Sequence, residues 1–255
     1  MYQYIEKNPL YAIFTSEKKW LHYIEESNTM KITAIVTGTI ETWLHLLSRP
    51  LVRDSGIRIS VPVACYLLEH NGKKLLFDAG QTVPERKQET LANYFVKVTP
   101  EETAAQQLKN SGTNPDSIDY IILSHAHADH CNGLKHFPCA KVIAQTQTAD
   151  ALRHFNNEFT SIDGKYDVLG DGSIVCIPTP GHAPGHQSLL VTCDDGNKIL
   201  LIGDAVYMPE ALEYEPSAQE QHEKPDFFNS LKLLRSLQNE GVKLCFGHYP
   251  YSFIN

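Results

Sequence analysis

The chain has 255 residues, 42% of them hydrophobic, which is enough for one large domain or two small ones with a sizeable core. Its net charge of -8, without any block of Lys or Arg, argues against nucleic acid or an anionic membrane surface as a partner. The six cysteines form no CxxC pair, the first residues lack a signal-peptide pattern and no apolar run approaches membrane-spanning length, so we expect reduced thiols and a cytoplasmic protein.

Residues 1–29 form a segment of mixed charge with scattered aromatic residues, which ends just before the strand-like residues 32–36. We interpret residues 1–29 as an N-terminal extension that carries a short helix, and residues 30–255 as one domain. The aromatic residues of the extension are compatible with a cleft or a homodimer contact, although packing against the domain surface is the simpler interpretation.

Two later segments of the chain share one pattern. Residues 64–79 predict two strands joined by an Asn-Gly turn, and residues 187–205 predict two strands joined around an Asp-Gly turn, because such dipeptides suit tight hairpins. Both hairpins end in an Asp-Ala pair, whose aspartates are Asp78 and Asp204.

Each hairpin is followed by a helical pattern and then by an apolar strand that leads to a histidine. The predicted helices are residues 100–111 and 226–240, and the predicted strands are residues 118–123 and 242–246. The intervals agree, since 47 residues separate Asp78 from His125 and 44 separate Asp204 from His248. This repetition predicts two similar halves packed as a four-layer α/β sandwich (αβ/βα), with two unrelated hairpins as the alternative.

Four metal-ligand side chains lie within six residues after the first of these strands: His125, His127, Asp129 and His130. Imidazole and carboxylate ligands suit zinc, manganese, iron or cobalt, whereas calcium and magnesium sites are almost all oxygen. His125 and His127 project to one side of an extended segment, and a turn after them brings the other two ligands to a second point, so one segment can serve two metal ions. A closed structural zinc site is the alternative, but such sites usually recruit cysteine and only Cys131 is adjacent.

Further candidate ligands follow other strands. His182 lies in a loop of prolines and glycines after the strand-like residues 173–177, and we expect His186 to hold this loop by hydrogen bonds. Asp204 ends a buried strand, where an unpaired carboxylate is costly, so we expect it to bridge the two cations. Asp78, its counterpart in the first half, is expected to orient a ligating imidazole. The remaining histidines are interpreted as surface or core residues: His22, His45, His70, His136, His154 and His222.

Four segments resemble the metallo-β-lactamase superfamily, in the same order and at typical intervals. They are SHAHADH at 124–130, TPGHAPGHQS at 179–188, GDAVY at 203–207 and FGHYP at 246–250. The similarity spans residues 31–255, and within the superfamily the chain is most similar to the N-acyl homoserine lactonases, quorum-quenching hydrolases that open the lactone rings of bacterial signals. The resemblance implies the four-layer fold and two divalent metal ions, with zinc as the first expectation.

The resemblance also assigns roles to individual residues. The implied ligands are His125, His127 and His182 for one metal ion, Asp129, His130 and His248 for the other, and Asp204 for both. Tyr207 falls where these lactonases carry a tyrosine that contacts the substrate carbonyl. Glyoxalase II-like hydrolases have a different sequence after the aspartate that corresponds to Asp204. A packed aromatic residue is the alternative role for Tyr207.

The mechanism expected from these roles begins with a metal-bridging hydroxide that attacks the lactone carbonyl. Tyr207 and the first metal ion polarise the carbonyl oxygen, and Asp129 passes a proton to the departing ring oxygen. Ala128 stands where some lactonases have a bulky aromatic residue, and residues 1–29 exceed the family core, so the resemblance gives neither the acyl-chain preference nor the lid and dimer contacts. Candidates to contact an acyl chain, with ordinary packing as the simpler role, are Trp43, Leu44, Leu46, Leu47, Tyr94 and Phe95.

Three other functions compete with this hypothesis. A glyoxalase II-like thioesterase, or a hydrolase of phosphoesters, would usually need clustered basic residues, and only Lys135, Arg153 and Lys165 lie near the motifs. A redox enzyme such as a diiron oxygen reductase of this fold usually carries a glutamate where His127 stands, together with a flavin-binding domain. A non-catalytic binding protein would be expected to lose ligands, whereas this chain has all seven.

Overall fold

The structure, a computed structural model, describes residues 30–47, 56–85, 93–214, 217 and 224–249, and the backbone of residues 252–253. The predicted extension, residues 1–29, lies outside the described residues, so the domain boundary at residue 30 stays a prediction. Within the described ranges, none of the helices has the length and apolar character needed to cross a bilayer.

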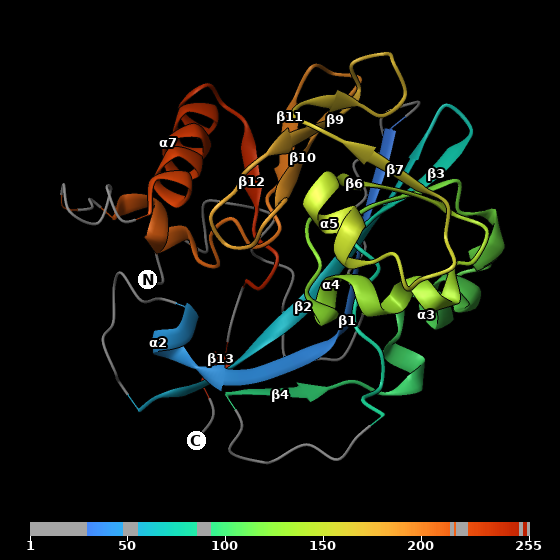
Figure 1. Cartoon of the computed structure of the whole chain (residues 1–255), viewed down its shortest axis with the longest axis horizontal. Helices are drawn as coiled ribbons and strands as arrows, with labels where there is room; N and C mark the ends of the chain where they lie inside the picture. Colours follow the sequence, from blue (N-terminus) through green and yellow to red (C-terminus); the bar gives the residue numbers. More distant parts are fainter. Residues whose placement is uncertain are drawn as a thin grey trace.

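The described residues form two β-sheets that pack face to face (Figure 1). The larger sheet has the strand order β4-β1-β2-β3-β5-β6-β7, with β13 paired to β2, and the smaller sheet has the order β12-β11-β10-β9-β8. The larger sheet consists of β1 (Met30–Trp43), β2 (Arg58–His70), β3 (Lys73–Phe77), β4 (Tyr94–Lys97), β5 (Tyr120–Ile122), β6 (Lys141–Gln145), β7 (Phe159–Ile162) and β13 (Ser252–Phe253). The smaller sheet consists of β8 (Tyr166–Asp167), β9 (Ile174–Pro178), β10 (Gln187–Thr192), β11 (Lys198–Leu201) and β12 (Lys243–Cys245).

Helices cover the outer faces of the two sheets (Figure 1). Helices α3, α4 and α5 pack on the larger sheet, and α7 packs on the smaller one. The α-helices are α2 (Leu44–Leu47), α3 (Ala104–Asn110), α4 (Ala128–Cys131), α5 (Thr146–Ala151) and α7 (Pro225–Asn239). The 3-10 helices are η1 (Pro100–Glu102), η2 (Pro115–Ser117), η3 (Asn132–His136) and η4 (Pro209–Glu213). This order of layers, helix, sheet, sheet and helix, confirms the predicted four-layer sandwich.

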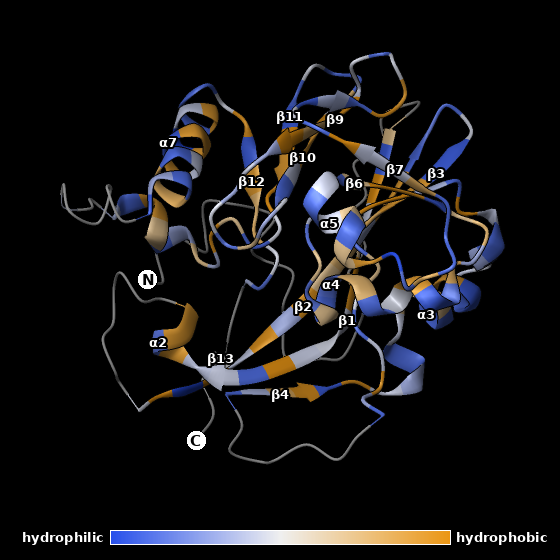
Figure 2. Ribbon diagram, in the orientation of Figure 1, coloured by the Kyte–Doolittle hydropathy of each residue, from blue (hydrophilic) through white to orange (hydrophobic). Residues whose placement is uncertain are grey.

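Apolar side chains are buried between these layers. Figure 2 shows hydrophobic stretches along several of the strands. Between the sheets, Phe77 of β3 belongs to the same buried cluster as Leu189 of β10. Outside the sheets, Leu108 anchors α3 in one cluster and Leu231 anchors α7 in another. Full burial of one side chain of this size contributes about 1.5–3 kcal/mol, so these clusters fix how the layers sit against each other.

Both predicted hairpins are present. In the first, β2 pairs with β3 up to His70 and Lys73, and the two residues between them, Asn71 and Gly72, have positive φ angles of 48° and 75°. A two-residue hairpin needs this left-handed backbone at both positions, which Asn and Gly tolerate best. In the second, β10 pairs with β11 around a turn in which Gly196 has a φ of 84°.

The two halves continue in the same way after their hairpins. β3 lies parallel to β5, which the chain reaches through η1 and α3, and β11 lies parallel to β12, which it reaches through α7. The predicted repeat is therefore confirmed in the pairing of the strands. As a consequence, β3, β5, β11 and β12 each end just before a candidate site residue. These residues are Asp78, His125, Asp204 and His248.

Several boundaries differ from the predictions by one to three residues, and two larger differences have a visible cause. The helix predicted at residues 100–111 is divided, because Thr103 adopts an extended backbone (ψ 147°) while its amide and hydroxyl both donate to the carbonyl of Pro100. The strand predicted at residues 32–36 continues to residue 43 as β1, past an irregularity at Gly38. A Cβ at Gly38 would lie 2.3 Å from the carbonyl oxygen of Lys97, so glycine permits β4 to approach β1 here.

Candidate metal centre

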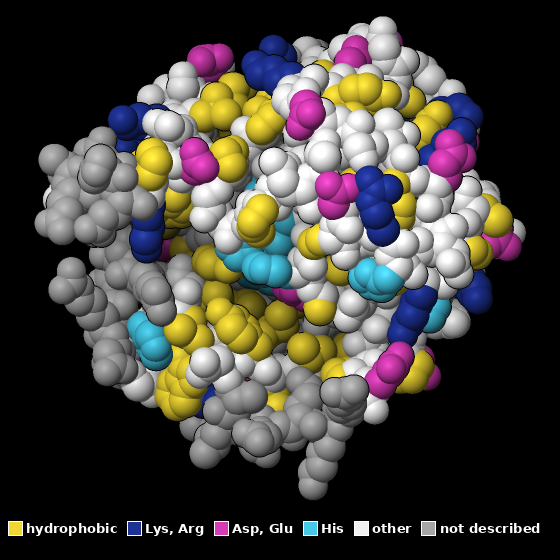
Figure 3. Space-filling model, viewed as in Figure 1, with side chains coloured by type: hydrophobic (Ala, Val, Ile, Leu, Met, Phe, Trp, Pro, Cys, Tyr) yellow, Lys and Arg dark blue, Asp and Glu magenta, His cyan; other side chains and the backbone are white. Residues whose placement is uncertain are grey.

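All seven predicted ligands lie together at one edge of the two sheets. His125 follows β5, His182 follows β9, Asp204 follows β11 and His248 follows β12. The carboxyl ends of these strands meet between the sheets, which is why residues far apart in the sequence become neighbours. On the surface, a group of histidine side chains lies in the wall of a hollow with apolar side chains beside it (Figure 3).

The segment after β5 supplies four of these side chains through a change in backbone conformation. His127 is still extended (φ -76°, ψ 149°) and forms the N-cap of α4, so the helix begins at the next residue. The amide of His130 donates to the carbonyl of His127 over 3.0 Å, which turns Asp129 and His130 away from the direction of His125. The predicted turn between two ligand points is therefore present.

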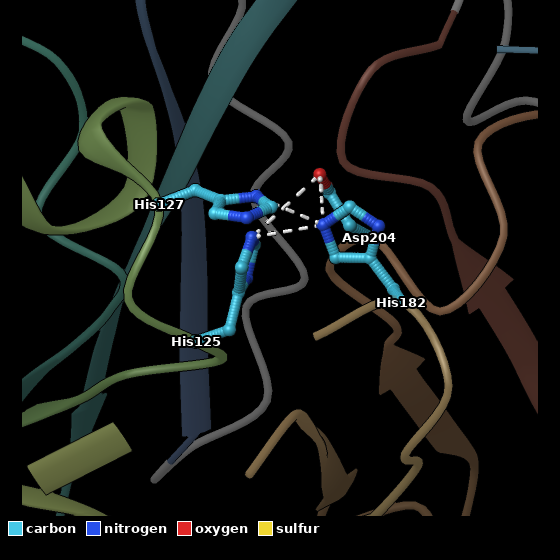
Figure 4. A group of neighbouring side chains, drawn as sticks. All are labelled: His125, His127, His182 and Asp204. Carbon is cyan, nitrogen blue, oxygen red and sulfur yellow. Dashed lines mark hydrogen bonds and ion pairs between the residues drawn. The ribbon is translucent and has the colours of Figure 1, made fainter. Parts of the chain in front are cut away.

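Three imidazoles and one carboxylate form the first group (Figure 4). The Nε2 atom of His182 lies 3.2 Å from Nε2 of His125 and 3.0 Å from Nδ1 of His127. Asp204 completes the group, with its Oδ2 atom 3.5 Å from His182 and 3.9 Å from His125. The four ligand atoms lie within 4.8 Å of one another, a spacing and donor set that suit one first-row divalent cation.

Two imidazoles and two carboxylates form the second group. The Nε2 atoms of His130 and His248 each lie 3.4 Å from Oδ2 of Asp129 and 3.3 Å from Oδ1 of Asp204. His130 Nε2 and Asp204 Oδ1 are buried, and neither has a hydrogen-bond partner among the described residues. Buried polar atoms without a partner are costly, and a cation between them would remove that cost, so the residues fit a metal ion.

Asp204 belongs to both groups because its two oxygens face different ways. Oδ1 faces the second group and Oδ2 faces the first, while the side chain as a whole is only 4% exposed. Burial alone raises the pKa of this carboxyl, but the imidazoles of His130 and His248 outweigh it and hold the pKa well below its usual range. A fully ionised carboxylate thus lies between the two groups, as a shared ligand requires.

The two groups differ in their affinity for positive charge. In the first group, burial lowers the pKa of His182 to about 4 and that of His125 well below its usual value, so both present neutral nitrogen lone pairs. In the second group burial acts in the same direction, but Asp204 and Asp129 outweigh it and raise the pKa of His248 to about 10 and that of His130 well above the usual value. The carboxylates that attract protons to the second group would attract a cation equally.

Hydrogen bonds behind the second group orient its imidazoles. His130 Nδ1 lies 2.8 Å from Asp78 Oδ2, and Asp78 also accepts from the amide and hydroxyl of Ser124 at 2.7 and 2.9 Å. His248 Nδ1 donates to the carbonyl of Pro62 over 2.7 Å. Each Nδ1 is thereby occupied and each Nε2 faces the centre, which is how outer hydrogen bonds usually fix ligating histidines. Asp78 has the orienting position that the sequence predicts for it.

Tyr207 lies at the border of the first group. Its hydroxyl is 3.1 Å from Nδ1 of His182, and burial raises its pKa well above the usual value, so the phenol stays protonated. Its ring also packs against an apolar cluster that includes Val63 and Met208. The hydroxyl therefore lies at the centre, as the lactonase hypothesis expects. The ring is at the same time packed in an apolar cluster, as expected for the alternative role of a packed aromatic residue.

His186 has a contact that the sequence does not predict. It holds the loop as expected, with Nδ1 at 3.0 Å from the carbonyl of Thr179, but its Nε2 also accepts the amide of Asp204 over 3.1 Å. Of the other histidines, the described ones lie outside both groups: His45, His70, His136 and His154. His22 and His222 lie outside the described residues.

The chain is similar to known proteins of one family. Residues 59–248 match the Metallo-beta-lactamase superfamily. An N-acyl homoserine lactonase of Bacillus thuringiensis is 33% identical over 212 residues, which cover 76% of this chain and 83% of the relative. The N-acyl homoserine lactonase AttM of Rhizobium radiobacter is 26% identical over 253 residues, covering 89% and 95%.

A solved structure gives the same result. The structure of an N-acyl homoserine lactone hydrolase with the product N-hexanoyl-L-homoserine bound at its catalytic metal center superposes with a TM-score of 0.72 at 27% identity, covering 87% of this chain and 94% of that one. The chain belongs to the metallo-beta-lactamase superfamily.

Proposed function

We propose that this protein is a dinuclear metal-dependent hydrolase that opens lactone rings, with N-acyl homoserine lactones as its substrates. The observation that carries the proposal is the pair of ligand groups that share the Asp204 carboxylate, with the Tyr207 hydroxyl at their border. The relatives named N-acyl homoserine lactonases support the same reaction.

The ligands of the proposed centre are His125, His127 and His182 for one ion, Asp129, His130 and His248 for the other, and Asp204 for both. Two divalent cations bound there would supply a water-derived nucleophile at neutral pH and polarise the substrate carbonyl. Three nitrogens and one oxygen in the first group favour zinc, and the donor sets are also compatible with manganese, iron or cobalt.

Tyr207 would donate a hydrogen bond to the carbonyl oxygen of the lactone. If Nε2 of His182 is a ligand, Nδ1 carries the hydrogen and donates to the Tyr207 oxygen. The hydrogen of the phenol is then left for another acceptor. A donor held at the edge of the centre stabilises the negative charge that develops on the carbonyl oxygen during attack.

Asp129 would handle the proton of the leaving group. Its side chain is 17% exposed, compared with 1% for His130 and 4% for His248, so it is the ligand of the second group nearest to solvent. Burial raises the pKa of Asp129, but His130 outweighs it and keeps the carboxylate ionised. We infer that the carboxylate takes a proton from the attacking water on its other oxygen, since Oδ2 faces His130 and His248, and passes this proton to the ring oxygen as the bond between that oxygen and the carbonyl carbon breaks.

The surroundings favour a neutral substrate with an apolar tail. Apolar side chains lie beside the histidines in the hollow (Figure 3), and the cluster under Tyr207 includes Val96 of β4. Leu44 and Leu47, two candidates for acyl-chain contact, are buried within this cluster and form its support. Tyr94 is 52% exposed at the start of β4 and is a better candidate for direct contact.

Two of the three basic residues that a phosphate or glutathione thioester would use are engaged elsewhere. Lys135 forms an ion pair with Glu85, and Arg153 forms one with Asp150. Both ion pairs are exposed, so they weigh only slightly against the glyoxalase II-like alternative. A homodimer and residence in the cytoplasm stay predictions from the sequence.

The proposal is tested by assaying the zinc-loaded protein on homoserine lactones of graded acyl length, beside a glutathione thioester and a β-lactam. Ring opening releases a proton, which a pH indicator detects. We expect the highest kcat/KM on a lactone, and a loss of that activity in Asp204→Asn. A higher kcat/KM on the thioester, or oxygen uptake without lactone cleavage, would contradict the proposal.

A further inference from the structure

His186 lies behind the first ligand group without belonging to it. The side chain is 1% exposed, and its ring packs near His125 and His182, with centroids 5.2 and 5.9 Å away. Its two nitrogens connect two segments that each carry a ligand. One segment is the loop of residues 179–186, which holds His182, and the other is the turn that holds Asp204.

The contact with the turn shows whether Nε2 of His186 donates or accepts a hydrogen bond. The amide of Asp204 lies 3.1 Å from it, and an amide can only donate, so Nε2 must accept. A neutral imidazole that accepts at Nε2 carries its hydrogen on Nδ1, and two acceptors lie beside Nδ1, the carbonyl of Thr179 at 3.0 Å and the hydroxyl oxygen of Thr179 at 2.9 Å. A single neutral tautomer of His186 satisfies both bonds.

The loop and the turn are each anchored around these bonds. The amide of Thr179 donates to the carbonyl of His186 at the base of the loop, and the Thr179 hydroxyl lies 2.8 Å from that of Ser188. In the turn, Gly203 has a φ of 56°, and a Cβ there would lie 3.1 Å from Nε2 of His186. Glycine at position 203 thus permits the left-handed turn to lie close against the imidazole of His186. This close approach brings the backbone amide of Asp204 within hydrogen-bond distance of the ring.

We propose that His186 is a positioning residue that aims the two oxygens of Asp204 at the two ligand groups. The inference rests on the metal-binding role proposed above for Asp204. His182 Nε2 and Asp204 Oδ2 are 3.5 Å apart, and His186 bonds directly to the backbone of both segments. A displaced Asp204 backbone would move the shared carboxylate relative to both groups at once, so the link affects both metal ions.

Three substitutions separate the two bonds of the imidazole. His186→Gln places an amide oxygen two bonds beyond Cγ, as Nε2 is, and keeps an acceptor for Asp204. His186→Asn can place its NH2 group one bond beyond Cγ, at the place of Nδ1, but it has no acceptor at the place of Nε2, and His186→Leu keeps neither bond. His154→Asn, at an exposed histidine outside both groups, is the matched control.

The measured quantity is the affinity of each full-length variant for zinc, obtained by competition with a chelator, together with the melting temperature. We expect the Asn and Leu variants to bind zinc at least about tenfold more weakly and the Gln variant to stay within about threefold of the wild type. A merely structural role would lower the melting temperature of all three without separating Gln from Asn. Equal zinc affinities for Gln and Asn, or wild-type affinity in all three, would overturn the proposal.

A measurement on the unmodified protein covers the case in which the variants do not fold. In nitrogen NMR of the zinc-loaded chain, we expect a hydrogen on Nδ1 of His186 and a through-bond coupling between its Nε2 and the amide nitrogen of Asp204. A hydrogen on Nε2 would overturn the proposal. If the wild type instead fails to bind two zinc ions while this coupling is present, the proposed function fails and the contact of His186 stands.

Discussion

Replacing Tyr207 with Phe removes one oxygen atom from the border of the centre. The hydroxyl lies 3.1 Å from His182 Nδ1, whereas the ring packs on the apolar cluster beneath it and would remain there. Because burial raises the pKa of Tyr207 well above its usual value, the hydroxyl is a neutral donor over the whole working range of pH. The substitution therefore isolates the hydrogen-bonding capacity of a single group.

Two effects of different size compete in this variant. Loss of the hydrogen bond to His182 costs about 0.5–1.5 kcal/mol, which corresponds to a factor of at most about tenfold. Loss of a donor to the developing oxyanion typically lowers kcat by about 100- to 1,000-fold. A fall of about 100-fold or more is thus too large for the contact with His182 alone.

The assay compares kcat and KM for a homoserine lactone, with both proteins shown to hold the same amount of zinc. We expect kcat to fall by about 100-fold or more, with a much smaller change in KM, because the donor acts mainly in the transition state. Tyr166→Phe, at a tyrosine that is 36% exposed on β8, is the control and should leave both constants unchanged. A kcat within about tenfold of the wild type would refute the catalytic role of the Tyr207 hydroxyl.

Residues around the centre should also respond to substitution and to pH. Asp78→Asn suits the left-handed backbone there (φ 62°), but it removes the charge and replaces one acceptor oxygen by an NH2 group, so we expect zinc affinity to fall about 10- to 100-fold in chelator competition. Gly133→Ala would place a Cβ only 1.9 Å from a backbone oxygen and should lower the free energy of unfolding in urea by about 3 kcal/mol. In the metal-free chain, burial lowers the pKa of His182 to about 4 and that of His186 to about 3, so their contribution to stability is full above about pH 6.5 and is lost as the pH falls through these values. The melting temperature of the metal-free chain should therefore fall between pH 7 and pH 4.

Each of these expectations has an outcome that contradicts it. Wild-type zinc affinity in Asp78→Asn would show that its hydrogen bonds do not support the centre. Gly196→Ala has open space around the new Cβ and costs only left-handed strain of about 1–2 kcal/mol, so Gly133→Ala must unfold at lower urea than this control. A constant melting temperature between pH 7 and pH 4 would mean that His182 and His186 are not buried as neutral groups.

The convergence of the candidate ligands could be predicted in part because some of its signals are local. His125 and His127 directly follow an apolar strand, and the alternation of a strand fixes that they project to the same side. Asp204 closes a buried strand with an ionisable group, which is informative because such a group needs a partner. The repeat of hairpin, helix and strand allowed the order of the helix and sheet layers to be predicted, because two amphipathic sheets bury their apolar faces against each other.

Other contacts depend on tertiary packing and leave little trace in the sequence. The bond between His186 and the amide of Asp204 joins a loop to a turn 18 residues away, and only a side-chain acceptor is visible in the sequence. The division of the predicted helix at Thr103 likewise reflects a competition between side-chain and helical hydrogen bonds that composition does not decide. The length of β1 follows from its pairing with β2 and β4, which a single strand pattern does not reveal.

The central claim is that one carboxylate, Asp204, serves two metal ions. The direct test is the zinc content of the full chain after reconstitution and removal of unbound metal, measured for the wild type and for Asp204→Asn. We expect two zinc ions per wild-type chain and a loss of zinc from both groups in the variant, because Oδ1 and Oδ2 face different groups. One ion or fewer in the wild type, or two tightly bound ions in Asp204→Asn, would contradict the account.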